Sequence, residues 1–172
     1  MDDGNAAGSI AQRRKERKVK MHEKAGRIDI LGVELEWLLK LEATGDKYCM
    51  LAARVPAGVG VPPHRHPDQE SFFVLEGQAE FALDVNGELV WNRAGAGELV
   101  NIPPEALHGF RNAGSSDVRL LITGTEGLGR FFAEAGRELA EGESPQAQPT
   151  METVQRVLAI AEKYGQQFMA PA

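Results

Sequence analysis

The stretch from Gly58 to Gly77, GVGVPPHRHPDQESFFVLEG, decides the fold. Side chains two residues apart in an extended strand point to the same face, so His64 and His66 project together. Pro67-Asp68 favours a turn, after which Glu70 returns to that face. Two imidazoles and one carboxylate therefore converge, and this ligand set suits a divalent transition metal.

A second stretch, Gly97 to Asn112, reads GELVNIPPEALHGFRN and ends in a short strand that begins at His108. His108 makes a fourth ligand available. Three neutral imidazoles and one carboxylate leave a charge of about +1 on a divalent ion. In octahedral geometry such an ion keeps open positions for water, dioxygen or substrate.

The two stretches resemble the paired motifs of the cupin superfamily, and the resemblance covers roughly residues 28 to 125. It implies an all-β fold, a cupin jelly-roll β-barrel of two antiparallel sheets. It also implies one divalent metal ion per chain, either Fe, Mn, Ni, Co, Cu or Zn. The implied metal ligands are His64, His66, Glu70 and His108.

One position departs from the family pattern. Glu105 stands where the family commonly has Gly. The turn before His108 therefore either avoids positive φ or carries strain of roughly 1 kcal/mol.

Short apolar runs broken by Gly, Pro, Asn and Asp predict an antiparallel all-β unit. The expected strands are roughly 28–42, 47–56, 70–76, 78–85, 88–92, 98–102, 107–112 and 117–123. Asn86-Gly87 tolerates positive φ and predicts a two-residue hairpin turn between two of them.

The chain divides into three regions by composition. Residues 1–25 hold a basic run and little to bury, which predicts a flexible arm, and residues 26–125 form the barrel. Residues 126–172 predict a C-terminal helical extension packed on the barrel. Leu128, Phe131, Phe132 and Leu139 recur at helical spacing, and Thr150 can cap a second helix.

Charge and cysteine content argue against a nucleic-acid partner and against a disulfide. The net charge is −6, although residues 1–20 carry six Lys or Arg against three Asp or Glu. An acidic body repels phosphates, which argues against nucleic acid as a partner. Cys49 is the only cysteine, so no intramolecular disulfide forms, and its apolar surroundings predict a packing residue.

The sequence contains no apolar run of about 18 residues and no hydrophobic stretch near its start. These features predict a cytoplasmic protein that does not enter a membrane. The family resemblance and the need to cover barrel-edge strands predict a homodimer.

Strand alternation predicts an apolar pocket around the metal. If Glu70 and His108 face inward, their strand neighbours two and four residues on do so too. The expected pocket residues are Phe72, Val74, Phe81, Trp91 and Phe110, with Trp37 and Met50 as further candidates.

The expected function is that of a metal-dependent enzyme on a small-molecule substrate. The helical tail adds a resemblance to bacterial single-domain cupins of the quercetin-2,3-dioxygenase-like kind, which implies a dioxygenase acting on an aromatic or enolic compound. Glu70 is the expected catalytic base. Two alternatives remain open: a non-redox isomerase, cyclase or lyase, and a small-molecule-binding module without turnover.

Overall fold

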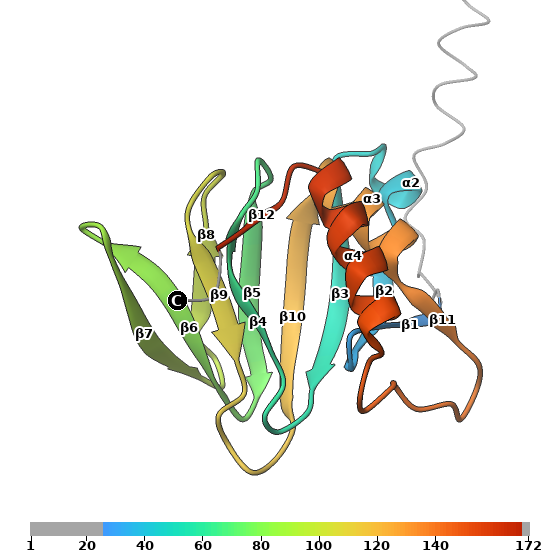
Figure 1. Cartoon of the computed structure of the whole chain (residues 1–172), viewed down its shortest axis with the longest axis horizontal. Helices are drawn as coiled ribbons and strands as arrows, with labels where there is room; N and C mark the ends of the chain where they lie inside the picture. The colour runs from blue at the N-terminus through green and yellow to red at the C-terminus, as the bar shows by residue number, and fades with distance from the viewer. Residues whose placement is uncertain (1–25, 170–172) are drawn as a thin grey trace, which may run out of the picture.

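The structure is a computed structural model that describes residues 26–169. These residues form a pair of antiparallel sheets that face each other as a jelly-roll barrel, which confirms the predicted all-β fold (Figure 1). The predicted basic arm, residues 1–25, lies outside the described residues.

The larger sheet has seven strands in the order β11-β1-β2-β3-β10-β5-β8. Its long central strands alternate buried and less buried side chains, as a sheet with one face on a core requires. The strands are β1 (Arg27–Ile30), β2 (Val33–Leu39), β3 (Tyr48–Val55), β5 (Glu70–Glu76), β8 (Leu99–Ile102), β10 (Val118–Thr125) and β11 (Arg137–Leu139).

The smaller sheet has five strands in the order β12-β4-β9-β6-β7. They are β4 (Gly60–Arg65), β6 (Gln78–Val85), β7 (Glu88–Gly95), β9 (His108–Arg111) and β12 (Gln167–Phe168). The β6–β7 hairpin turns at Asn86 and Gly87, with φ of 56° and 88°. The predicted two-residue turn is thereby confirmed.

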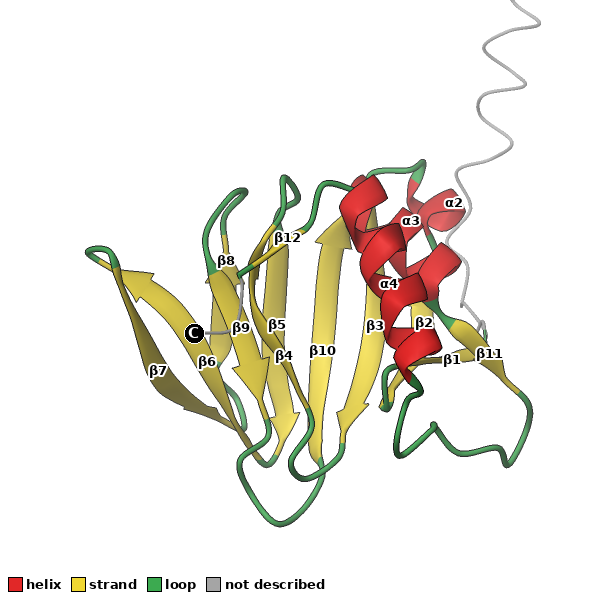
Figure 2. Cartoon of the chain, viewed as in Figure 1, coloured by secondary structure: helices red, strands yellow, loops and turns green. Residues whose placement is uncertain are grey.

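Three helices accompany the sheets in residues 26–169: α2 (Leu41–Thr44), α3 (Glu126–Ala135) and α4 (Met151–Lys163). Helices α3 and α4 pack together on the side of the barrel near β2 and β3 (Figure 2). The Thr150 side chain accepts a hydrogen bond from the Thr153 amide at 3.2 Å, which confirms the predicted cap of α4. None of the helices in the described range is long and apolar enough to cross a membrane.

Two predicted elements are wrong in detail. The expected strand 28–42 is two strands, because Leu31 and Gly32 adopt φ of 51° and 92° and turn the chain back on itself. Leu139 belongs to β11 and not to a helix. Helix α3 ends at Ala135, and the following residues pair with β1 instead, which satisfies backbone groups at that sheet edge.

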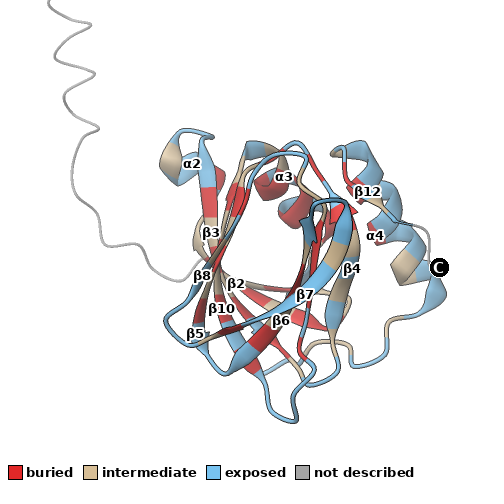
Figure 3. Cartoon of the chain, turned by 90° about the vertical axis from the view of Figure 1, so that its left-hand side faces the viewer, coloured by how far each residue is buried: buried red, intermediate tan, exposed pale blue. Residues whose placement is uncertain are grey.

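The core lies between the two sheets. In the view along the barrel, buried residues gather on the inner strand faces and on α3 (Figure 3). Cys49 is fully buried there, and burial raises the pKa of its thiol to about 11. It is a packing residue, as its sequence surroundings predict.

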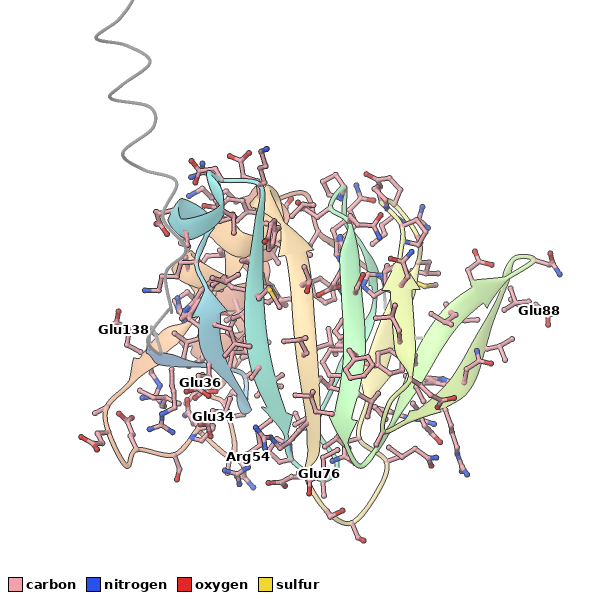
Figure 4. All side chains as sticks on the ribbon, turned by 180° about the vertical axis from the view of Figure 1, so that it is seen from behind. Glu34, Glu36, Arg54, Glu76, Glu88 and Glu138 are labelled. Carbon is pink, nitrogen blue, oxygen red and sulfur yellow. The ribbon has the colours of Figure 1, made fainter. Side chains whose placement is uncertain are left out.

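The outer face of the larger sheet is charged (Figure 4). Glu34 accepts a hydrogen bond from Arg27 at 2.8 Å and lies 3.6 Å from Arg54, which also bonds Asp117. These side chains alternate with the apolar ones that face inward.

Candidate metal centre

The four predicted ligands come from both sheets. His64 lies near the end of β4 and pairs with His108 at the start of β9. His66 follows β4 directly, and Glu70 opens β5 in the other sheet. The link from β4 to β5 thus crosses between the sheets and brings the ligands together inside the barrel.

Each imidazole is oriented by a backbone carbonyl. The Nδ1 atoms of His64, His66 and His108 lie 3.0, 3.0 and 2.9 Å from the carbonyl oxygens of Pro62, Asp68 and Ala106. A carbonyl only accepts, so each Nδ1 donates its proton there. Each Nε2 is then left with a lone pair, which is the arrangement of metal-binding histidines.

The free ring nitrogens of the three histidines and the Glu70 carboxylate lie close together, and all of them are acceptors. The potential ligand nitrogens of His64, His66 and His108 lie within 4.8 Å of one another, and all three residues are buried. Glu70 Oε2 lies 3.3 Å from Nε2 of both His66 and His108. Among the described side chains, His108 Nε2 is buried without any hydrogen-bond partner. Lone pairs that face a carboxylate in this way fit a bound divalent cation.

Electrostatics keep the carboxylate ionised. Burial alone raises the pKa of Glu70, but the neighbouring imidazoles of His108 and His66, which carry positive charge when protonated, outweigh it and lower this pKa to about 2. Burial lowers the pKa of His64 to about 4, so its ring is neutral near pH 7. Burial also disfavours protonation of His66, yet Glu70 more than offsets this and raises its pKa. A neutral His64 and an anionic Glu70 are the forms that bind metal.

Asp68 anchors the loop that carries His66, a role that the sequence did not reveal. Its carboxylate accepts hydrogen bonds from the Thr125 hydroxyl at 2.7 Å and from the Gly127 amide at 2.9 Å. It therefore ties the loop to the start of α3. A local sequence pattern assigns Asp68 only to a turn, because both of its partners lie far along the chain.

A cavity of about 310 Å³ opens on the cluster. His64 and Glu70 line it together with Phe72 and Phe110, two of the predicted pocket residues. Further walls come from β1 and β2, from α3 and α4, and from Phe168 of β12. The ring of Phe168 stacks on His64, with centroids 5.1 Å apart.

The other predicted pocket residues lie elsewhere. Val74 and Phe81 are buried but do not line the cavity, and neither do Trp37 and Met50. Trp91 is 36% exposed and stacks against the Arg111 guanidinium at 4.0 Å. The hairpin register explains this: Trp91 pairs with Ala82, so it lies on the face opposite to Phe81.

Glu105 adopts positive φ, at 64°, so the turn before His108 carries the strain that its Cβ imposes. The conformation lets its backbone amide donate to the His66 carbonyl at 2.8 Å and joins the two ligand segments. We expect Glu105→Gly to raise the free energy of unfolding by about 0.5–1 kcal/mol. Glu105→Ala, which keeps Cβ, should not. Denaturant titration of both variants checks this, and an equal gain in both would contradict it.

Part of the barrel is similar to a known protein family. Residues 52–124 match a family described as Cupin domain. These residues are thus similar to a cupin domain, and the fold is the cupin jelly roll with a C-terminal helical extension. No curated protein matches the chain.

Several solved structures are similar to parts of the chain. A predicted oxalate decarboxylase from Thermotoga maritima is 27% identical, with a TM-score of 0.51 over 63% of this chain and 97% of that one. The Cnp3 cupin domain of Schizosaccharomyces pombe is 20% identical, with a TM-score of 0.48 over 56% of this chain and 63% of its own. The DMSP lyase DddQ from Ruegeria pomeroyi is 30% identical, with a TM-score of 0.40 over 46% of this chain and 39% of its own. This chain therefore spans less than two thirds of the last two. The resemblance to quercetin-2,3-dioxygenase-like proteins stays a prediction.

Proposed function

We propose that this cupin-domain protein is a metal-dependent enzyme, a dioxygenase that acts on a small aromatic or enolic substrate inside the barrel. One observation carries the proposal: a largely apolar cavity of about 310 Å³ opens on His64 and Glu70 of the imidazole–carboxylate cluster. A concave apolar site with a few polar groups at one end is the usual form of a small-molecule site.

Different residues of the chain have different roles in the proposed reaction. Phe72 and Phe110, with ring centroids 5.4 Å apart, form an apolar wall for a planar substrate and exclude water. Glu70, ionised and at the end of the cavity, accepts the proton of a substrate hydroxyl. A divalent ion bound in the cluster would supply Lewis acidity and, where redox-active, reactivity toward dioxygen.

The cavity disfavours oxalate, although one structural neighbour is described as a predicted oxalate decarboxylase. Oxalate carries two negative charges, and it would lie beside the Glu70 carboxylate. No Arg or Lys occurs among the described residues that line the cavity, so apart from the metal ion nothing there offsets the repulsion. An apolar substrate with one ionisable oxygen suits this lining better.

The test is oxygen uptake by the protein loaded separately with Fe, Mn, Ni, Co, Cu or Zn. The compounds to screen are enols, catechols and flavonols, with oxalate as the charged comparison. We expect oxygen consumption with an enolic or aromatic compound, none with oxalate, and none in a His66→Ala variant. Substrate loss without oxygen consumption would replace the dioxygenase with a non-redox isomerase, cyclase or lyase. If a compound binds but is not converted with any of these metals, the protein is a small-molecule-binding module.

We also propose that the protein is a homodimer in the cytoplasm. Support for the dimer comes from β8 and β7, which form sheet edges next to exposed apolar side chains, such as the 65% exposed Leu99. The homodimer and the cytoplasmic location are both predictions.

A further inference from the structure

We propose that the side-chain amide of Gln166 binds the substrate's polar oxygen in the barrel cavity and thereby helps to choose the substrate. This inference rests on the proposed function in one respect: it takes the cavity as the substrate site. Gln166 would be a specificity-determining residue supplied by the C-terminal segment, well outside the matched residues 52–124.

The chain places Gln166 beside the metal centre. After α4, Gly165 adopts φ of 79° and lies so near Pro67 that an added Cβ would be 3.2 Å from its ring. Strand β12 then pairs with β4, with Gln167 opposite Arg65 and Phe168 opposite His64. Gln166 therefore enters β12 next to the loop that carries His66.

Burial along this segment alternates. Gln166 is 6% exposed and Phe168 is half-buried, whereas Gln167 between them is exposed. Gln166 directly precedes β12, and it faces the same cavity as Phe168, whose ring stacks on His64. Both residues line the cavity.

The Gln166 side-chain amide has no partner among the described residues. The backbone amide of this residue donates to the Ala161 carbonyl at 2.9 Å, but its side chain makes no hydrogen bond there. An amide that faces an apolar cavity without a protein partner gains free energy when a ligand oxygen or nitrogen pairs with it. An amide both donates and accepts, so it recognises a carbonyl or a hydroxyl equally.

No other polar side chain of the described residues is available for this contact. Among those that line the cavity, only His64, Glu70 and Gln166 have polar side chains. His64 belongs to the three-histidine cluster, and Glu70 contacts the other two histidines of that cluster. Gln166 is thus the one group left in this lining to recognise a ligand, and the ligand class is a compact, mostly apolar molecule with an oxygen at the end nearest the metal.

A pair of matched ligands isolates the hydrogen bond. Acetophenone and α-methylstyrene have nearly the same shape, but only the first has a carbonyl oxygen. We would measure the dissociation constants of both by isothermal titration calorimetry with the full-length protein as purified. The variants are Gln166→Met, which keeps the chain length without the amide, Gln166→Leu as a second replacement, and Gln167→Met as the outward-facing control.

We expect the preference for acetophenone to fall by about 3- to 10-fold in both Gln166 variants and to stay unchanged in Gln167→Met. Thermal unfolding supplies a second readout. Replacing an unpaired buried amide with an apolar side chain should leave Tm unchanged or raise it by about 2 °C.

An unchanged preference would overturn the proposal, and so would a fall in Tm, which would mean that Gln166 is structural. Failure of the wild-type protein to bind either compound would overturn it as well. None of these readouts uses turnover, so the proposal can fail while metal loading and oxygen uptake succeed, and the reverse also holds.

Discussion

Glu70→Gln should reduce turnover per bound metal by about 10²- to 10⁴-fold, the usual contribution of a positioned proton transfer. Glu70 Oε2 lies 3.3 Å from two imidazole nitrogens, and the residue lines the cavity. Gln keeps the size and one carbonyl oxygen but loses the charge and the basicity. Three imidazoles still hold a metal ion, with affinity reduced by about 10-fold or more.

The matched variant is His66→Ala, which removes a neutral donor and should abolish metal binding together with activity. Metal content by elemental analysis and oxygen uptake with the substrate identified in the screen are measured for both variants. The rate of oxygen uptake divided by the metal content distinguishes the role of Glu70 as a base from its role as a metal ligand. If Glu70 only binds metal, the rate per metal ion will stay within a few-fold of wild type, and the role of Glu70 as a base is then excluded.

Gly60→Ala should destabilise the protein by about 3 kcal/mol and lower Tm by about 6 °C or more. Gly60 lies in β4 opposite Arg111 of β9. An added Cβ would lie 2.5 Å from the Phe110 carbonyl oxygen and 2.8 Å from the Arg111 Cα atom. These are backbone atoms, so relief requires the strands to separate. The same two strands hold His64 opposite His108, and metal affinity should fall as well.

Gly95→Ala is the control for that prediction. Gly95 is also a strand glycine, but its added Cβ would meet only the Glu98 carboxylate, at 3.7 Å. Its stability should stay within about 0.5 kcal/mol of wild type. Equal losses of Tm in the two variants would show that the close approach of β4 and β9 is not responsible.

Some features followed from the sequence because they depend on local geometry. The period of two in a strand places His64 and His66 on one face, and the Asn86-Gly87 turn fixes the β6–β7 hairpin. The same hairpin register also places Trp91 outside, opposite Ala82, so this error in the predicted pocket was avoidable from the residues alone.

Only the tertiary structure decided which distant segments complete the site. Helical spacing in α3 and α4 indicates an apolar stripe, but not that Phe131 and Val157 form walls of the metal cavity. Leu139 follows that spacing and is still a strand residue, because the edge of β1 offers backbone partners that no local pattern records. Gln166 carries no sequence signal, because only folding places its amide on the wall of the cavity that His64 also lines. The local sequence determines the direction in which a metal-binding side chain points, whereas long-range packing determines which residues surround it.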